Sequence, residues 1–200
     1  MLHDTIDAQE LETTDNHDPL PGDFAIWIFI LAELAVFSIL FIAFAFARLY
    51  NLEMFAEGYE HLNRVAGFIN TLALITSSYF VVRGVLAIKA GNNLACSRWL
   101  NMALLFALIY VVVKLWEYTQ AFSAGYNLHT NTFYMLYFLI TFFHFAHVLL
   151  GMVILLVVSK KAKAGDYSAA DHNGIETGAS YWHMVDLLWV ILFPLVYVIH

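Results

Sequence analysis

Five long, uninterrupted apolar runs constrain the fold of this chain more than any other feature of its sequence. They span approximately residues 24–50, 65–89, 99–122, 132–158 and 179–199. A helix of about 20 residues crosses a hydrocarbon core of about 30 Å, and each run is long enough to do so. The runs are continuous rather than alternating, which argues against the strands of a membrane barrel. The sequence therefore predicts an all-α, polytopic membrane protein with five transmembrane helices.

Composition supports lipid as the solvent and excludes several classes of function. Apolar residues make up 62% of the chain and charged residues 12%, which leaves too little polar surface for a soluble domain of 200 residues. No cluster of Lys and Arg offers a surface to nucleic acid. The single cysteine, Cys96, forms neither a CxxC nor a CxxCH motif, so we expect no covalent haem and no iron–sulfur cluster.

The first 21 residues differ from the rest of the chain. Seven acids precede the first apolar run, with no Lys or Arg among them: Asp4, Asp7, Glu10, Glu12, Asp15, Asp18 and Asp23. The segment lacks the basic and apolar regions of a signal peptide, so we expect it to be retained. We predict an acidic, disordered cytoplasmic tail over 1–21 and a five-helix transmembrane domain over 22–200.

The distribution of basic residues near the span ends predicts the orientation. On the side of the N-terminus lie Lys89, Arg98, Lys160, Lys161 and Lys163, and on the other side Arg48 and Arg64. Because cytoplasmic loops carry the excess of Lys and Arg, we expect a cytoplasmic N-terminus. After five crossings the C-terminus would lie outside, in the periplasm of a bacterium.

Ionisable residues within the spans point to interior faces, because an unpaired charge in hydrocarbon is costly. Glu33 lies in the middle of the first span. Lys114 and Glu117 are three residues apart in the third span, about one helical turn, and we expect them to pair near its outer end.

A second set of ionisable residues lies in the last two spans: His144, His147, Glu176, His183 and Asp186. The two histidines of the fourth span share one helix face, on which Gly151 permits close approach of a neighbouring backbone. The other three residues share one stripe of the last span. We expect a buried polar cluster that locks these two helices together, with each imidazole paired to Glu176 or Asp186.

A metal or haem site is the alternative interpretation of this set, and the number of histidines argues against it. Membrane di-iron enzymes require repeated histidine boxes, and a di-haem cytochrome requires two histidines on each of two helices. The chain has nine histidines, most of them outside the spans. We therefore expect no metal, no haem and no catalytic residue.

The remaining polar and aromatic residues of the spans are expected to have structural roles. Asn70, Thr71, Ser77 and Ser78 are small and can hydrogen-bond between helices. Trp27, Trp116, Trp182 and Trp189 are expected mostly in interface belts or on lipid-facing surfaces.

Four segments together resemble subunit III of the haem-copper cytochrome c and quinol oxidases. They are NTLALITSSY at 70–79, KLWEY at 114–118, FYMLYFLITFFHFAHVLLG at 133–151 and ETGASYWHMVDLLWVILFPLVY at 176–197. The resemblance covers the chain from the first span to the end. AELAVF, FFHFAH and DLLWVILFPLVY favour the five-helix, NorE-like type that is associated with nitric oxide reductase.

The resemblance implies a cofactor-free accessory subunit of the bacterial inner membrane, with bound phospholipid. Its partner would be the haem-bearing catalytic subunit of a nitric oxide reductase, which is preferred, or of a terminal oxidase. Glu33 would line a lipid cleft. Phe145 replaces a glycine of the family motif and makes the contact beside His144 bulkier. A small proton or solute transporter and a membrane assembly factor are the alternatives, although the spans lack the broken helices of many transporters.

Overall fold

The fold was analysed in a computed structural model, which describes residues 23–199. The described residues form helices and no strands, and five helices are long and apolar enough to cross a membrane. They are α1 (Phe24–Tyr50), α3 (Arg64–Lys89), α4 (Asn93–Ser123), α5 (Thr132–Ala164) and α6 (Asn173–Phe193), which a π-helical turn, η1 (Pro194–Val198), continues. The all-α fold with five spans is thus confirmed, whereas the predicted tail lies outside the described residues.

Three helix ends lie beyond the predicted ones, and capping groups set the first two of them. The Asn92 side chain accepts a hydrogen bond from Ala95 N, so α4 begins at Asn93 instead of residue 99. Gly165, with φ 86°, ends α5 six residues after the predicted boundary. The last span begins at Asn173 rather than 179, which places Glu176 in its first turn.

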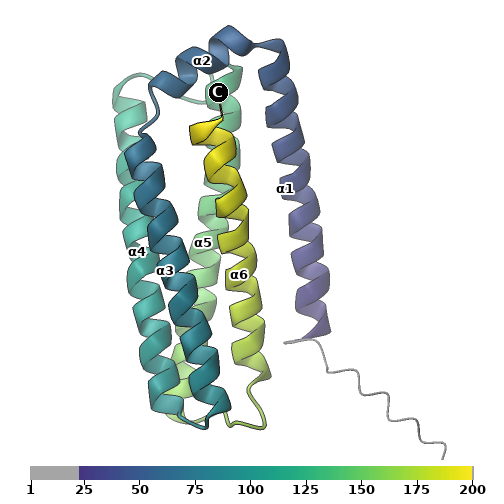
Figure 1. Ribbon diagram of the computed structural model, residues 1–200, viewed down its shortest axis with the longest axis vertical. Coiled ribbons are helices and arrows are strands. Elements are labelled where there is room, and N and C mark those ends of the chain that lie inside the picture. Colours follow the sequence, from purple (N-terminus) through teal and green to yellow (C-terminus); the bar gives the residue numbers. More distant parts are fainter. Residues whose placement is uncertain (1–22, 200) are drawn as a thin grey trace, which may run out of the picture.

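The segment between the first two spans contains the short helix α2 (Leu52–Glu60). This helix lies across one end of the bundle (Figure 1). Phe55 and Tyr59 are buried, and both contact the ring of Phe133 on α5 with centroids 5.3 Å apart. Burial raises the pKa of Tyr59, although Arg48 acts in the opposite direction, so its phenol is uncharged at neutral pH.

The helices α3 to α6 form a four-helix bundle, and α1 stands against α5 and α6 at one side of it (Figure 1). In an apolar stretch of 18 residues within α1, only 17% of the residues are buried, compared with 33–50% in the equivalent stretches of the other spans. Aromatic pairs hold α1 in place, among them Phe29 with Tyr181 and Phe37 with Phe143. Most of the surface of α1 is therefore left for lipid or for another polypeptide.

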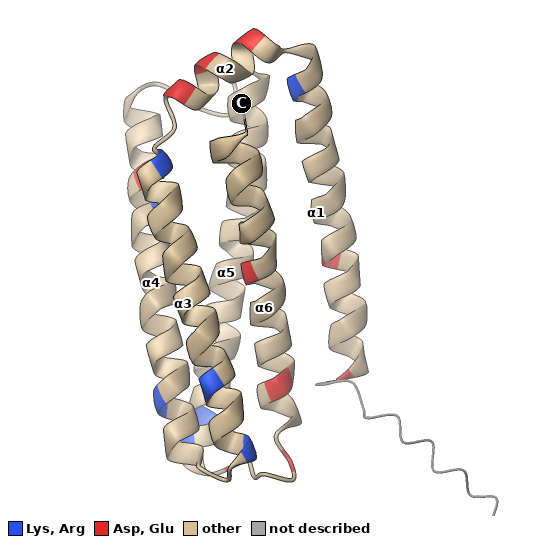
Figure 2. Cartoon of the chain, in the orientation of Figure 1, with Lys and Arg blue, Asp and Glu red and all other residues tan. Residues whose placement is uncertain are grey.

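Charge is distributed unequally between the two ends of the bundle. Figure 2 shows most Lys and Arg at the end where α3 meets α4, whereas the acids of α2 lie at the opposite end, beside the C-terminus. This asymmetry is the one on which the predicted orientation depends.

Candidate functional site

Lys114 and Glu117 form a buried ion pair at the centre of a tyrosine cluster. Lys114 Nζ lies 3.0 Å from Glu117 Oε2, and the two side chains are 0% and 5% exposed. The hydroxyls of Tyr137 and Tyr197 donate to Glu117 Oε1 over 2.9 and 2.6 Å. Lys114 Nζ in turn donates to the Tyr197 hydroxyl at 2.7 Å and the Tyr137 hydroxyl at 3.2 Å. The pair therefore joins α4, α5 and η1 through hydrogen bonds that compensate for its burial.

Aromatic rings complete the environment of the ammonium group. Lys114 Nζ lies 4.9 Å from the ring centroid of Tyr118 and 5.7 Å from that of Trp189. Ring faces attract a cation, most strongly where water is excluded. The sequence did not indicate Tyr137 and Tyr197, because tyrosine is common at membrane interfaces. The one available signal was the need of a buried lysine for oxygen acceptors.

Pro194 explains how Tyr197 reaches this cluster. Proline has no N–H and cannot continue the α-helical hydrogen-bond pattern. The chain continues as a π-helical turn, in which Ile199 N donates to Pro194 O at 2.9 Å. Tyr197 is 1% exposed as a result.

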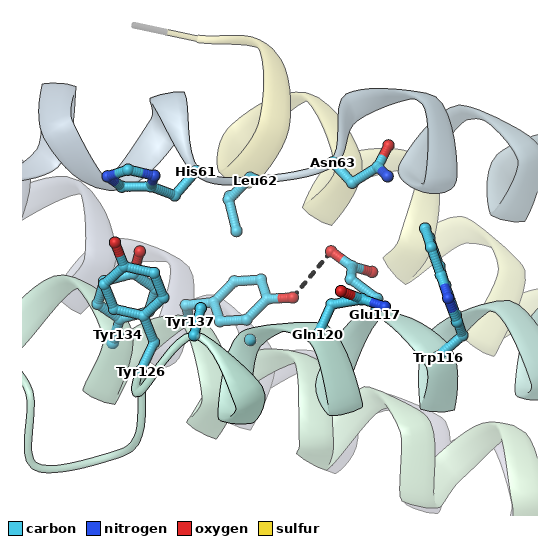
Figure 3. A pocket seen from close by; sticks show the side chains of 11 residues that line it. His61, Leu62, Asn63, Trp116, Glu117, Gln120, Tyr126, Tyr134 and Tyr137 are labelled. Carbon is cyan, nitrogen blue, oxygen red and sulfur yellow. Dashed lines mark hydrogen bonds between the residues drawn. The ribbon is translucent and has the colours of Figure 1, made fainter.

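A pocket of about 240 Å³ lies beside the ion pair, between α4, α5 and the turn from α2 to α3. Figure 3 shows Glu117 and Tyr137 at its inner side, with the hydrogen bond between them, and His61 and Asn63 across from them. Polar and aromatic side chains form most of the wall. The pocket thus connects the ion pair with the end of the bundle that α2 covers.

Glu33 pairs with His147 and fixes α1 against α5. His147 Nε2 lies 3.0 Å from Glu33 Oε2, and His147 Nδ1 lies 2.7 Å from Phe143 O. A carbonyl oxygen only accepts, so Nδ1 carries a hydrogen. The contact between Nε2 and the carboxyl group therefore needs a second proton, on either partner. The pair as a unit is neutral, which suits its place within the membrane.

This geometry predicts different outcomes for two replacements of Glu33. Glu33→Gln should leave the fold intact, because the amide N–H donates to His147 Nε2. Glu33→Leu should cost about 1–3 kcal/mol, because a buried nitrogen loses its partner. Unfolding by SDS in mixed micelles measures both variants. A Gln variant as unstable as the Leu variant would show that the charge, and not the hydrogen bond, holds α1.

His144 makes a different set of contacts, although it lies one turn from His147. Its Nε2 lies 3.0 Å from Val185 O and so carries the hydrogen of that bond, while Nδ1 accepts from the Tyr110 hydroxyl at 3.0 Å. His144 is 0% exposed. It links α4, α5 and α6 as a neutral, structural imidazole.

Glu176, His183 and Asp186, which share one side of α6, face α3 instead of α5. His183 Nδ1 lies 2.6 Å from the Ser78 hydroxyl oxygen, and Asp186 lies beside the same serine. Glu176 pairs with Lys89 on α3 at 2.8 Å and with His172 at 3.3 Å. The expected pairing of each imidazole with Glu176 or Asp186 is therefore wrong for both α5 histidines. The two acids of α6 face α3, whereas the two α5 histidines have other partners. The five residues predicted as one cluster therefore make four separate sets of contacts.

The family model described as cytochrome c oxidase subunit III matches residues 18–200. The chain belongs to the cytochrome c oxidase subunit III family. Members of this family are non-catalytic subunits of an oxidase complex.

Individual relatives cover most of the chain. Cytochrome c oxidase subunit 3 of Synechocystis sp. is 32% identical over 177 residues, which are 88% of this chain and 75% of the relative. The protein of the same name from Thermostichus vulcanus is 30% identical over 202 residues, covering 99% and 98%. The haem-copper oxidase subunit I+III of Aeropyrum pernix is 28% identical over 201 residues, covering 96% of this chain and 25% of that protein.

The small polar residues of this subunit III chain hold α3 against two neighbours. Ser77 donates to Ala103 O on α4 at 2.8 Å, and Thr71 accepts from Trp189 Nε1 on α6 at 3.0 Å. Asn70 is 0% exposed, and neither of its side-chain polar atoms has a partner among residues 23–199.

Two of the tryptophans expected at interfaces or on lipid-facing surfaces are buried instead. Trp182 and Trp189 are 0% exposed, whereas Trp116 is 48% exposed. The ring of Trp182 lies over Gly151, where an added Cβ would come within 2.8 Å of it. Gly151 therefore admits an indole ring and not the neighbouring backbone that we expected.

Phe145, the departure from the family motif, is accommodated without displacing His144. Its ring lies between two tyrosines of α4, with centroids 6.4 Å from Tyr110 and 6.1 Å from Tyr118. Phe145 is 7% exposed, so its bulk fills the contact between α4 and α5.

Within the described residues no group of three or more His, Cys, Asp and Glu side chains is arranged to hold a metal ion. Glu33, Lys114, Glu117 and the two α5 histidines contact one another, hydroxyls or carbonyls. Glu117, which lines the pocket of about 240 Å³, is already engaged by Lys114 and two tyrosines.

Proposed function

We propose that this chain is a cofactor-free accessory subunit that packs in the membrane against the haem-bearing catalytic subunit of a haem-copper oxidase. The family match over residues 18–200 is the observation that carries this proposal. The Aeropyrum relative, named subunit I+III, supports the choice of partner because its single chain combines two subunits.

The internal hydrogen bonding supports a structural role. Lys114, Glu117 and His144 are engaged within the chain, and each of these side chains bonds to at least one other helical element. Groups tied in this way rigidify a bundle and are poorly placed to transport a solute. The subunit would stabilise its partner and bind phospholipid, with Glu33 beside a lipid cleft.

The membrane and orientation belong to the same proposal. We place the chain in the bacterial inner membrane with its N-terminus in the cytoplasm and its C-terminus in the periplasm. The gathering of Lys and Arg at one end of the bundle supports this orientation (Figure 2).

The catalytic partner would reduce either nitric oxide or oxygen. The motifs AELAVF and FFHFAH favour a nitric oxide reductase system, and this association remains a prediction. The relatives described above are oxidase subunits and favour oxygen.

Purification of the tagged chain from its native membrane in mild detergent tests the proposal. We expect a haem absorption spectrum and a stoichiometric catalytic subunit, whose identity by mass spectrometry separates an oxidase from a nitric oxide reductase. A colourless chain that purifies alone would contradict a stable complex and favour an assembly factor or a transporter. A membrane protein of similar size with the same tag serves as the control.

A further inference from the structure

A shallow groove of about 210 Å³ runs between α3 and α6 on the surface of the bundle. Val82 and Leu86 of α3 form one wall, and Ser180 and His183 of α6 form the other. The ion pair of Lys89 and Glu176 closes the end of the groove where α3 ends and α6 begins. The groove is therefore apolar on one side and polar on the other.

The polar side of the groove reaches deep into the membrane. His183 and Asp186 lie ten and thirteen residues after Asn173, the first residue of α6. At about 1.5 Å per residue they lie about 15 and 20 Å from the start of the helix. This depth is near the middle of a hydrocarbon core, where water is absent and an unsatisfied polar group is costly.

Hydrogen bonds within the chain do not satisfy these two residues. His183 Nδ1 is engaged by the Ser78 hydroxyl at 2.6 Å. If Nδ1 carries the ring hydrogen, Nε2 can accept a hydrogen bond, and if Nδ1 accepts from Ser78, Nε2 can donate one. In both cases no residue among 23–199 bonds to His183 Nε2. Asp186 Oδ1 is buried and also has no hydrogen-bond partner among the described residues.

A second groove, between α4 and α5, provides a contrast. It is larger, about 690 Å³, and its walls are leucine, valine and methionine side chains. Its one polar residue, Asn101, is engaged, because its Oδ1 accepts from Ser159. Acyl chains alone satisfy such a surface.

We propose that the α3–α6 groove seats a transmembrane helix of the catalytic subunit, which presents a hydroxyl or amide side chain to His183 Nε2. This inference rests on the proposed function and specifies its contact. Lipid is a poor occupant, because acyl chains have no hydrogen-bonding group at this depth and Lys89 is already neutralised by Glu176. The subunit I+III relative favours the other subunit over a second copy of this chain.

Photo-crosslinking in the native membrane tests the contact. The probe benzoylphenylalanine replaces Val82 in the α3–α6 groove or, as the matched control, Leu105 in the α4–α5 groove; these side chains are 43% and 52% exposed. We expect the probe at 82 to crosslink to the catalytic subunit, or to prevent its co-purification, and the probe at 105 to label lipid.

Three results would overturn the inference: the reverse pattern, lipid labelling from both positions, or crosslinking of position 82 to a second copy of the chain. Co-purification by the unsubstituted chain decides the proposed function separately. If that chain retains its partner while position 82 labels only lipid, the groove inference fails and the proposed function stands.

Two substitutions separate the partner contact from internal packing. His183→Phe removes both ring nitrogens and should lower recovery of the catalytic subunit about fivefold. Ser78→Ala removes the internal contact but keeps Nε2, so recovery should stay close to that of the unsubstituted chain. Equal losses from both variants would assign His183 to α3–α6 packing alone.

Discussion

Replacing Lys114 with methionine destabilises the chain by about 3–5 kcal/mol, because it leaves the Glu117 carboxylate buried without its cation. The side chain of Lys114 is 0% exposed, so water cannot take the place of the ammonium group. Tyr137 and Tyr197 still donate to Glu117, but two neutral donors do not balance a charge in this environment. Unfolding by SDS in mixed micelles gives the change in free energy.

A second replacement distinguishes the lost charge balance from lost packing. In Lys114→Met combined with Glu117→Gln the site is neutral, and the amide oxygen still accepts from both tyrosines. We expect this pair of changes to recover most of the stability. Lys89→Met is the control, because that side chain is 50% exposed and such pairs contribute about 0–1 kcal/mol. A double variant no more stable than Lys114→Met would mean that methionine fits poorly at position 114.

Trp189→Ala has the second large effect, a loss of about 3–5 kcal/mol, because it opens a cavity at the meeting point of α3, α4, α5 and α6. The indole ring packs edge-on against Tyr110 with centroids 5.0 Å apart, and its centroid lies 5.1 Å from that of His144. Nε1 donates to Thr71, and the ring faces Lys114. One truncation therefore removes packing and a hydrogen bond at once.

Trp116→Ala is the matched control for this truncation. Trp116 lies on α4 and is 48% exposed, so its loss should change stability by about 0.5 kcal/mol. Thermal unfolding of both variants in the same detergent measures the difference. Equal losses would show that the two rings contribute alike and that burial does not govern their effect.

The same residues show how far sequence reasoning extends for the polar sites. It identified Glu33, Lys114, Glu117 and the histidines, because ionisable side chains are rare in apolar runs and each requires an interior position. It did not find the Tyr137 and Tyr197 hydroxyls, which complete the Lys114 site. A tyrosine in a span carries no such signal, since its ring suits lipid, interface and core alike.

Sequence by itself determined the number of spans, the helical class and the family, because hydrocarbon permits few backbone structures and requires about 20 apolar residues for each crossing. Only the tertiary structure decided which polar groups meet. His144 and His147 are three residues apart, yet one contacts Tyr110 and Val185 and the other contacts Glu33. Helical spacing places a side chain on a face, but the packing of the neighbouring helices determines which partner that face meets.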